Sequence, residues 1–263
     1  MTAAYLALQR DNAPANTGKT WNDIRIDNSP VALNDEAGVS TGWSFAYTTA
    51  PNSEFTSGAS AVGTGDAAYI DEAIIMAESH AMNDATNWAA AEITNLDNSS
   101  LYDLGFTSSQ GFNRKMEIRV NGGASQVLNS EGVEKGTGEL KLFTDISPVS
   151  GTITVEYRTD ISSDGWSYVN AGFIVEQGPP PASLTVTQTE LTPGGTISGS
   201  YSNYATIPTT LTVSDGTNTI TVASPTISDN GDGTGTFSGT MPSLPTTGTA
   251  NLVLFGNVTV ELS

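Results

Sequence analysis

Cysteine is missing from this chain, and histidine occurs once, as His80. Without cysteine there is no disulfide framework, no thiolate nucleophile and no cysteine-ligated zinc or iron–sulfur centre. A serine-type catalytic triad would need His80 as its base, and the chain has neither a Gly-x-Ser-x-Gly nor a Ser-x-x-Lys motif to supply the nucleophile. A hydrolase of that kind is therefore not expected. A metal site at His80 would need carboxylates to complete it.

Basic residues are also scarce, with 9 against 28 acidic residues and a formal net charge of −19. Arg158 is the last of them, so the rest of the chain carries acids and no base. Binding to nucleic acid or to an anionic membrane surface depends on clustered lysine and arginine, so the composition argues against both partners. Membrane insertion is not expected either, because no run approaches the roughly 18 apolar residues of a membrane-spanning helix.

The first ten residues lack a basic n-region, and their apolar stretch is too short for the h-region of a signal peptide. The sequence therefore predicts synthesis in the cytoplasm without a signal peptide. Charged residues make up only 14% of the chain. Aromatic and β-branched residues nevertheless recur throughout, so a folded core is expected rather than disorder.

Residues 177–183 (Gln-Gly-Pro-Pro-Pro-Ala-Ser) divide the chain. The consecutive prolines remove backbone donors and favour polyproline II, which predicts a short, stiff linker. One domain is then expected over residues 1–176 and a second over residues 184–263. Threonine is abundant in the second domain, and its branched side chain suits a half-buried strand.

Alternation of apolar and polar residues with a period of two dominates both domains. It places Ile153, Val155 and Tyr157 on one face of a strand, and in the second domain it predicts an early edge strand around Leu184. Together with frequent Asn-Gly and Asp-Gly turn signals, the pattern predicts an all-β protein made of two sandwiches. Residues 66–74 are the exception, because they fit a short helix and a buried strand equally well.

Several motifs of the N-terminal domain occur in the order found in galactose-binding-like jelly-roll modules of secreted glycan-active and adhesive bacterial proteins. They are residues 18–24 (Gly-Lys-Thr-Trp-Asn-Asp-Ile), 93–104, 113–122 and 168–174. The resemblance covers about residues 2–176 and implies a jelly-roll β-sandwich, with weak carbohydrate binding and a structural calcium as family properties. Residues 184–263 resemble a bacterial immunoglobulin-like module, mainly through residues 229–237, which implies an architecture and no activity.

Sugar binding would use an exposed aromatic ring against the C–H face of the sugar, with polar side chains beside it. Trp43 shares a strand face with other aromatic residues, and Trp88 precedes an alanine-rich strand, so both are expected in the core. The candidate carbohydrate-binding residues are Trp166, Tyr168 and Asp164, at a junction between a loop and a strand. The alternative is that Trp166 also belongs to the core.

A candidate metal site lies in the second domain. Asp229, Asn230, Asp232 and Thr234 offer hard oxygen ligands of the kind that calcium prefers. The segment lacks the distal glutamate of an EF-hand loop, and as a plain hairpin turn its Asn-Gly and Asp-Gly steps would only supply positive φ angles. Both interpretations stay open. With 28 acids, some pair will reach a catalytic separation by chance, so no glycosidase pair is singled out and no enzyme is expected.

Sandwiches of this kind usually act outside the cell, yet this chain has no cysteine and is expected to lack a signal peptide. A phage particle accounts for both properties, because it is assembled in the cytoplasm and acts outside the cell. By this analogy we predict a non-catalytic structural accessory protein of a phage virion, such as a head decoration, fibre or tail-associated protein. Its partners would be capsid or tail proteins and host-surface glycans, in a homo-oligomer. The alternative is a carbohydrate-binding module with an immunoglobulin-like spacer from a secreted system.

Overall fold

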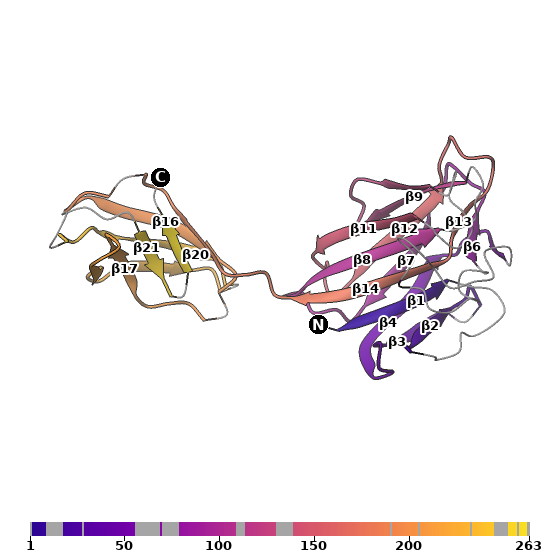
Figure 1. Cartoon of the computed structure of the whole chain (residues 1–263), viewed down its shortest axis with the longest axis horizontal. Helices are drawn as coiled ribbons and strands as arrows, with labels where there is room; N and C mark the ends of the chain where they lie inside the picture. The colour runs from indigo at the N-terminus through magenta and orange to yellow at the C-terminus, as the bar shows by residue number, and fades with distance from the viewer. Residues whose placement is uncertain are drawn as a thin grey trace. The chain divides into compact units, whose positions relative to one another are not determined.

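The computed structural model describes residues 2–8, 18–27, 29–55, 69, 79–108, 114–129, 139–189, 191–204, 206–231, 233–244, 252–256 and 258–261. Within these residues the regular elements are all β-strands, as the alternation predicts (Figure 1). The chain divides into two compact units, Met1–Gly178 and Pro179–Ser263, and this division falls inside the proline-rich segment 177–183. The segment 66–74 lies outside the described residues, apart from Tyr69.

The first unit is a β-sandwich of the jelly-roll class. Its five-stranded sheet has the order β11 (Glu139–Ile146), β8 (Leu101–Ser108), β14 (Ala171–Gly178), β1 (Ala3–Leu8) and β2 (Trp21–Ile24). Its six-stranded sheet has the order β10 (Gln126–Asn129), β9 (Lys115–Val120), β12 (Ile153–Thr159), β7 (Ala89–Thr94), β4 (Ser40–Thr49) and β3 (Val31–Asn34). A smaller sheet consists of β13 (Ser167–Val169), β6 (Ser79–Met82) and β5 (Ser53–Phe55). Neighbouring strands are antiparallel except for β1 and β2, which run parallel.

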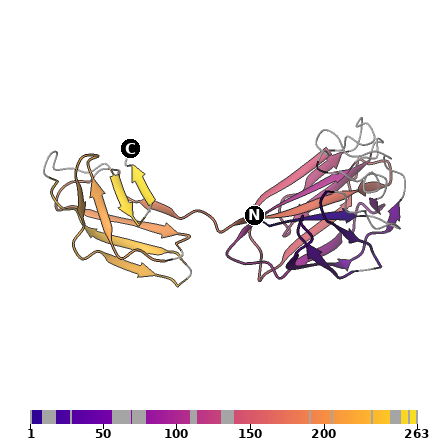
Figure 2. The same ribbon diagram turned by 60° about the horizontal axis from the view of Figure 1, so that its bottom comes forward.

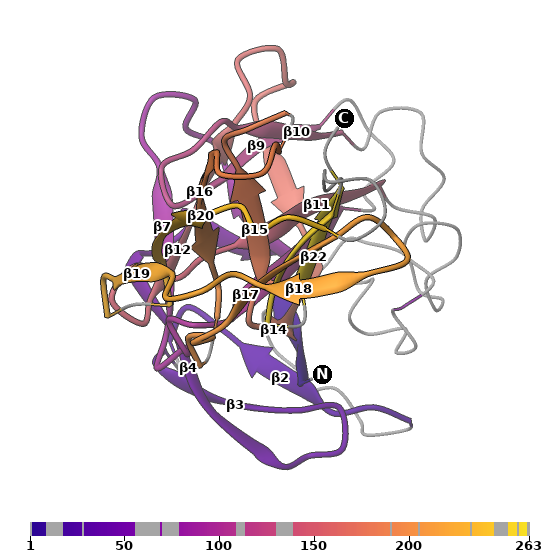
Figure 3. The same cartoon turned by 90° about the vertical axis from the view of Figure 1, so that its left-hand side faces the viewer.

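The two large sheets enclose one hydrophobic core, to which alternate residues of each strand contribute. Ile153, Val155 and Tyr157 of β12 are buried, as expected from the sequence. Trp43 on β4 meets Tyr102 on β8 edge to face, with ring centroids 5.7 Å apart, so the two sheets are in direct contact. At the sides of the sandwich the edge strands lie next to each other, β2 beside β3 and β10 beside β11 (Figure 3).

The second unit is an immunoglobulin-like sandwich of two four-stranded antiparallel sheets (Figure 2). One sheet has the order β15 (Ser183–Val186), β16 (Thr196–Ser202), β20 (Gly235–Thr240) and β19 (Thr226–Asp229). The other has the order β18 (Thr219–Thr221), β17 (Leu211–Ser214), β21 (Leu252–Phe255) and β22 (Val258–Glu261). This order matches strands A, B, E and D against C′, C, F and G of immunoglobulin domains. The predicted early strand, β15, is an edge strand.

Both units place glycine directly opposite an aromatic residue on the neighbouring strand. In the first unit Gly172 of β14 pairs with Phe106 of β8, and a Cβ atom at Gly172 would lie 2.9 Å from that ring. In the second unit Gly199 of β16 pairs with Phe237 of β20, and a Cβ atom at Gly199 would lie 2.6 Å from that ring. The absence of a side chain therefore lets each ring lie across the neighbouring strand.

We expect Gly199→Ala to lower the stability of the second unit by about 1–3 kcal/mol, because the added methyl group would meet both the Phe237 ring and the Thr185 carbonyl oxygen. Thermal and urea denaturation of the full chain measure this. Ser200→Ala, at the exposed neighbouring position, is the control and should change stability by less than about 0.5 kcal/mol. Equal stability of the two variants would contradict the close approach at Gly199.

Candidate functional site

The predicted carbohydrate-binding residues lie in and just after the loop that joins β12 to β13. Hydrogen bonds within the loop hold its shape, because the Asp160 carboxylate accepts the Ser162 N–H at 2.8 Å and the Ser163 hydroxyl donates to the Trp166 carbonyl at 2.9 Å. The same hydroxyl accepts the Lys115 N–H at 3.1 Å, which ties the loop to β9. Trp166 therefore stands on a loop with a defined conformation.

The three predicted residues differ in exposure. Asp164 is exposed, Trp166 is partly buried, and Tyr168 is only 6% exposed, opposite Ala81 of β6. Burial raises the pKa of the Tyr168 phenol, while the nearby charge of Arg114 opposes part of that shift. Tyr168 therefore does not present a ring face to a sugar, and the surface groups are Trp166 and Asp164. Carbohydrate binding by these residues stays a prediction.

The predicted calcium segment forms the hairpin turn between β19 and β20. The Asp229 carboxylate accepts the Gly231 N–H at 2.8 Å, and the Asn230 side-chain amide donates to the Thr234 hydroxyl at 3.0 Å. Gly231 has a φ angle of 84°, as a turn glycine should. Asp232 lies outside the described residues, and among those described no group of three His, Asp or Glu side chains could hold a metal ion. Calcium binding therefore stays a prediction, although the turn already uses oxygen atoms of Asp229 and Thr234.

His80, the single histidine, lies fully buried on β6 within a cluster of polar side chains. Its Nδ1 atom is 2.5 Å from the Tyr47 hydroxyl of β4. Its Nε2 atom is 3.3 Å from the Glu54 carboxylate of β5, the residue directly opposite His80 in the sheet register. The carboxylate also accepts the Ile26 N–H at 2.6 Å. Three strands and one loop therefore meet at these side chains.

The charge on Glu54 determines how protons are arranged in this cluster. An ionised carboxylate only accepts, so the tautomer of His80 with its proton on Nε2 is favoured, and the Tyr47 hydroxyl donates to Nδ1. Burial raises the pKa of Tyr47 well above its ordinary value, and the neighbouring Tyr157 and Glu54 add to the shift. Tyr47 is therefore a neutral hydrogen-bond donor at physiological pH, and the cluster orders strands rather than presenting a reactive oxyanion.

The pKa of Glu54 is lower than its ordinary value. Burial alone would raise it, but the contact with His80, the hydrogen bond from the Ile26 N–H and the charge of Arg25 outweigh burial. Because the folded pKa lies below the unfolded one, ionised Glu54 stabilises the protein above the unfolded pKa. That contribution is lost as the pH falls through the folded pKa.

We expect Glu54→Gln to destabilise the chain by about 1–3 kcal/mol at neutral pH, because a hydrogen-bonded charge is replaced beside buried His80. The difference from wild type should begin to shrink as the pH falls below the ordinary glutamate pKa of 4.5, and it should disappear once the pH has fallen through the lowered pKa of folded Glu54. Urea denaturation across this pH range measures both effects. Glu36→Gln, at an exposed position, is the matched control. A Glu54→Gln deficit independent of pH would contradict the role assigned to the charge.

Trp88 does not belong to the core, so the sequence interpretation was wrong at this residue. Its ring lies on the outer face of the six-stranded sheet, with the Arg119 and Arg158 guanidinium carbons 4.2 and 4.4 Å from the ring centroid. Arg119 forms a bidentate pair with Glu156, at 2.8 and 2.7 Å, and Arg158 pairs with Glu117 at 2.5 Å. The guanidinium groups therefore occupy the ring surface that a sugar would need.

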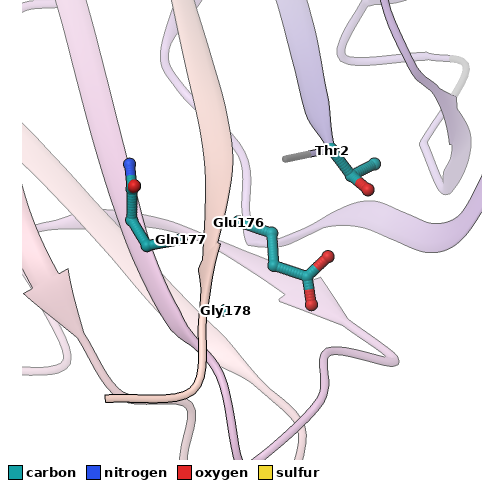
Figure 4. Close-up of a pocket in the computed structure, with 4 residues that line it drawn as sticks. All are labelled: Thr2, Glu176, Gln177 and Gly178. Carbon is teal, nitrogen blue, oxygen red and sulfur yellow. The ribbon is translucent and has the colours of Figure 1, made fainter. Parts of the chain in front are cut away.

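A surface pocket of the first unit is lined by Thr2, Glu176, Gln177 and Gly178 (Figure 4). The Glu176 carboxylate accepts the Ser100 hydroxyl at 3.0 Å, so part of its hydrogen-bonding capacity is used within the protein. None of the candidate residues from the sequence lines this pocket. Among the residues that the structure describes, no helix has the length and hydropathy needed to cross a membrane.

No protein-family model and no curated protein matches this chain. Among solved structures, the ANXUR1 extracellular domain from Arabidopsis thaliana is similar at 13% identity with a TM-score of 0.41, over 51% of this chain and 43% of that one. TmCBM61 in complex with beta-1,4-galactotriose is similar at 13% identity with a TM-score of 0.25, over 38% of this chain and 70% of that one. The exo-beta-1,3-galactanase from Phanerochaete chrysosporium, solved with galactose, is similar at 13% identity with a TM-score of 0.29, over 54% of this chain and 32% of that one. Scores this low support no inference about function.

Proposed function

We propose that this chain is a non-catalytic structural accessory protein of a phage virion, such as a head decoration, fibre or tail-associated protein. The observation that carries the proposal is the division into two sandwiches, each with a hydrophobic core of its own, on either side of a proline-rich segment. Such an arrangement suits a protein in which one module docks and the other extends from the docking site.

The charge distribution supports a position away from packaged nucleic acid. The chain carries 28 acidic and 9 basic residues, and the unit that begins at Pro179 has no lysine, arginine or histidine. Phosphate neutralisation needs clustered cations, so the second unit would be repelled by DNA and is suited to the outside of a particle. A base-free, acidic module also resists nonspecific association.

Exposed apolar side chains favour the first unit as the docking module. Among the described residues, the large apolar side chains that are strongly exposed all belong to it. Ile161 is 92% exposed at the tip of the ordered loop before β13, and Val149 is 67% exposed in a hairpin. Apolar side chains presented on ordered loops would bury surface against a protein partner.

We expect this chain in purified phage particles, and mass spectrometry of gradient-purified particles measures its presence. Ile161→Asp should lower its copy number per particle, because a charge would replace the most exposed apolar side chain. Thr259→Asp, at an exposed position of the second unit, is the control and should be incorporated normally. Absence of the wild-type chain from every particle fraction would overturn the proposal.

The alternative is a carbohydrate-binding module with an immunoglobulin-like spacer from a secreted system. It is favoured by Trp166, which stands partly exposed on an ordered loop beside the exposed Asp164. An aromatic ring with a neighbouring carboxylate is a combination that sugar sites use.

For this alternative we expect binding on a glycan array that falls by about tenfold or more in Trp166→Ala, because stacking on the ring is lost. Trp88→Ala is the control, since arginine side chains already cover that ring. A broad array without any bound glycan, or equal binding by wild type and Trp166→Ala, would overturn the alternative and leave the virion role open.

A further inference from the structure

One face of the second unit consists of hydroxyl groups. In the sheet β15-β16-β20-β19, inward residues such as Leu184, Tyr201 and Phe237 are buried, and the alternate residues face outward. At eleven outward strand positions the side chain is serine or threonine. These positions, called the hydroxyl face below, are Ser183, Thr185, Thr196, Ser198, Ser200, Ser202, Thr226, Ser228, Thr236, Ser238 and Thr240.

The strand register makes the hydroxyl face continuous. Thr185 of β15 pairs with Ser200 of β16, Ser200 pairs with Thr236 of β20, and Thr236 pairs with Ser228 of β19. One row of hydroxyl side chains therefore crosses all four strands. Neighbouring rows lie two residues apart along the strands, so the groups repeat about every 4.8 Å across the sheet and about 6.8 Å along it.

Strand propensity does not explain this composition, and other sheet faces of the protein do not share it. Threonine favours strands, but six of the eleven residues are serine, which is not among the residues enriched there. Outward positions of the unit's other sheet differ, since Leu252 and Leu254 lie on β21 and Glu261 on β22. The outer face of the six-stranded sheet in the first unit carries arginine–glutamate pairs. The exclusive use of hydroxyls is thus particular to one sheet.

Most of these hydroxyls remain available for a ligand. Ser183 and Ser202 are hydrogen-bonded to each other at 2.7 Å, and the Ser198 hydroxyl accepts the Gln188 side-chain amide at 2.9 Å. The row that crosses all four strands, Thr185, Ser200, Thr236 and Ser228, is called the central row. In the described part of the chain, none of its four hydroxyls makes a side-chain hydrogen bond to another protein group. All four residues are also exposed.

The chemistry of the hydroxyl face indicates its ligand. A hydroxyl both donates and accepts hydrogen bonds, so the face matches a ligand rich in hydroxyls. An anionic ligand would be repelled, because the unit contains acids and no base. A rigid planar ligand does not fit either, since β-sheets twist, whereas a flexible chain can follow the twist. We propose that the hydroxyl face binds a neutral, flexible polysaccharide through many individually weak hydrogen bonds.

This surface lies on a different unit from Trp166, and it does not depend on the virion role. Each hydroxyl–hydroxyl contact replaces contacts with water and contributes little, so useful affinity requires several contacts along one polymer chain. Polymers should therefore bind far better than their monosaccharides. Affinity electrophoresis suits such weak binding, and the net charge of −19 ensures migration of the full chain in a native gel.

We expect the full chain to be retarded in gels that contain dextran, pullulan or β-1,4-galactan, in at least one of the three. In gels that contain polygalacturonate, the anionic probe, it should not be retarded. No retardation in any of the neutral gels would overturn the proposal. Retardation by polygalacturonate alone would overturn it as well.

Variants in the central row and in the row next to it test whether the hydroxyl face is the surface that binds the polysaccharide. The test variant combines Ser200→Ala, Thr236→Val and Ser238→Ala, and the control combines Thr212→Val, Thr221→Val and Thr259→Val on the other sheet. Loss of several hydrogen bonds should weaken retardation of the test variant by about tenfold or more, with the control unchanged. Ser200→Glu, which adds bulk and charge at one exposed position, is a second disruption if the triple variant unfolds.

Equal retardation of test and control variants would overturn the proposal. So would loss of retardation in Trp166→Ala with the test variant unaffected, because binding would then belong to the first unit. Absence of the chain from phage particles refutes only the virion role, and it does not alter the expected gel result.

Discussion

Close approach of an aromatic ring to a glycine on the neighbouring strand recurs in both sandwiches and constrains how their cores are packed. In the first unit the Phe106 ring lies against Gly172. In the second unit the Tyr201 ring of β16 lies across β20 at Gly235, and the Phe237 ring of β20 lies across β16 at Gly199. Both of the latter rings contact Phe255 of the facing sheet, at centroid distances of 5.1 and 5.4 Å. Glycine thus allows large rings to fill the space between sheets without forcing the strands apart.

The sequence predicts those features of this fold that depend on local pattern. Alternation identifies β12 and β15, because every second residue faces the core and its neighbours are polar. The same reasoning failed at Trp88. The residues that follow it are alanines, which give no alternation of apolar and polar side chains, so the pattern could not show that the Trp88 ring points outward. The contacts of His80 were also beyond prediction, since Tyr47 and Glu54 reach it through strand pairing between distant segments.

The two units cover the outer faces of their sheets with different polar side chains. On the outer face of the six-stranded sheet, cross-strand pairs of arginine and glutamate neutralise each other, and Trp88 packs against the guanidinium groups. The second unit has no cation, so any carboxylate on a sheet face would remain unneutralised by a side chain. Its described acids are accordingly found in turns or at strand ends, as Asp215, Asp229 and Glu261. Uncharged polar side chains are then left to cover the strands, and on β15, β16, β20 and β19 these are hydroxyls rather than amides.

Avoidance of charge does not by itself produce the hydroxyl face, however. The other sheet of the same unit obeys the same restriction, and there Leu252 and Leu254 occupy alternate positions of β21. The restriction therefore permits apolar side chains at outward positions, and the strands β15, β16, β20 and β19 do not use them. A row of exposed hydroxyls that runs unbroken from Thr185 to Ser228 is a property of four strands acting together, because their register alone brings these residues side by side. Such a surface repeats in two directions and is not enclosed, so it suits a polymer chain better than a single small molecule, which binds in a pocket.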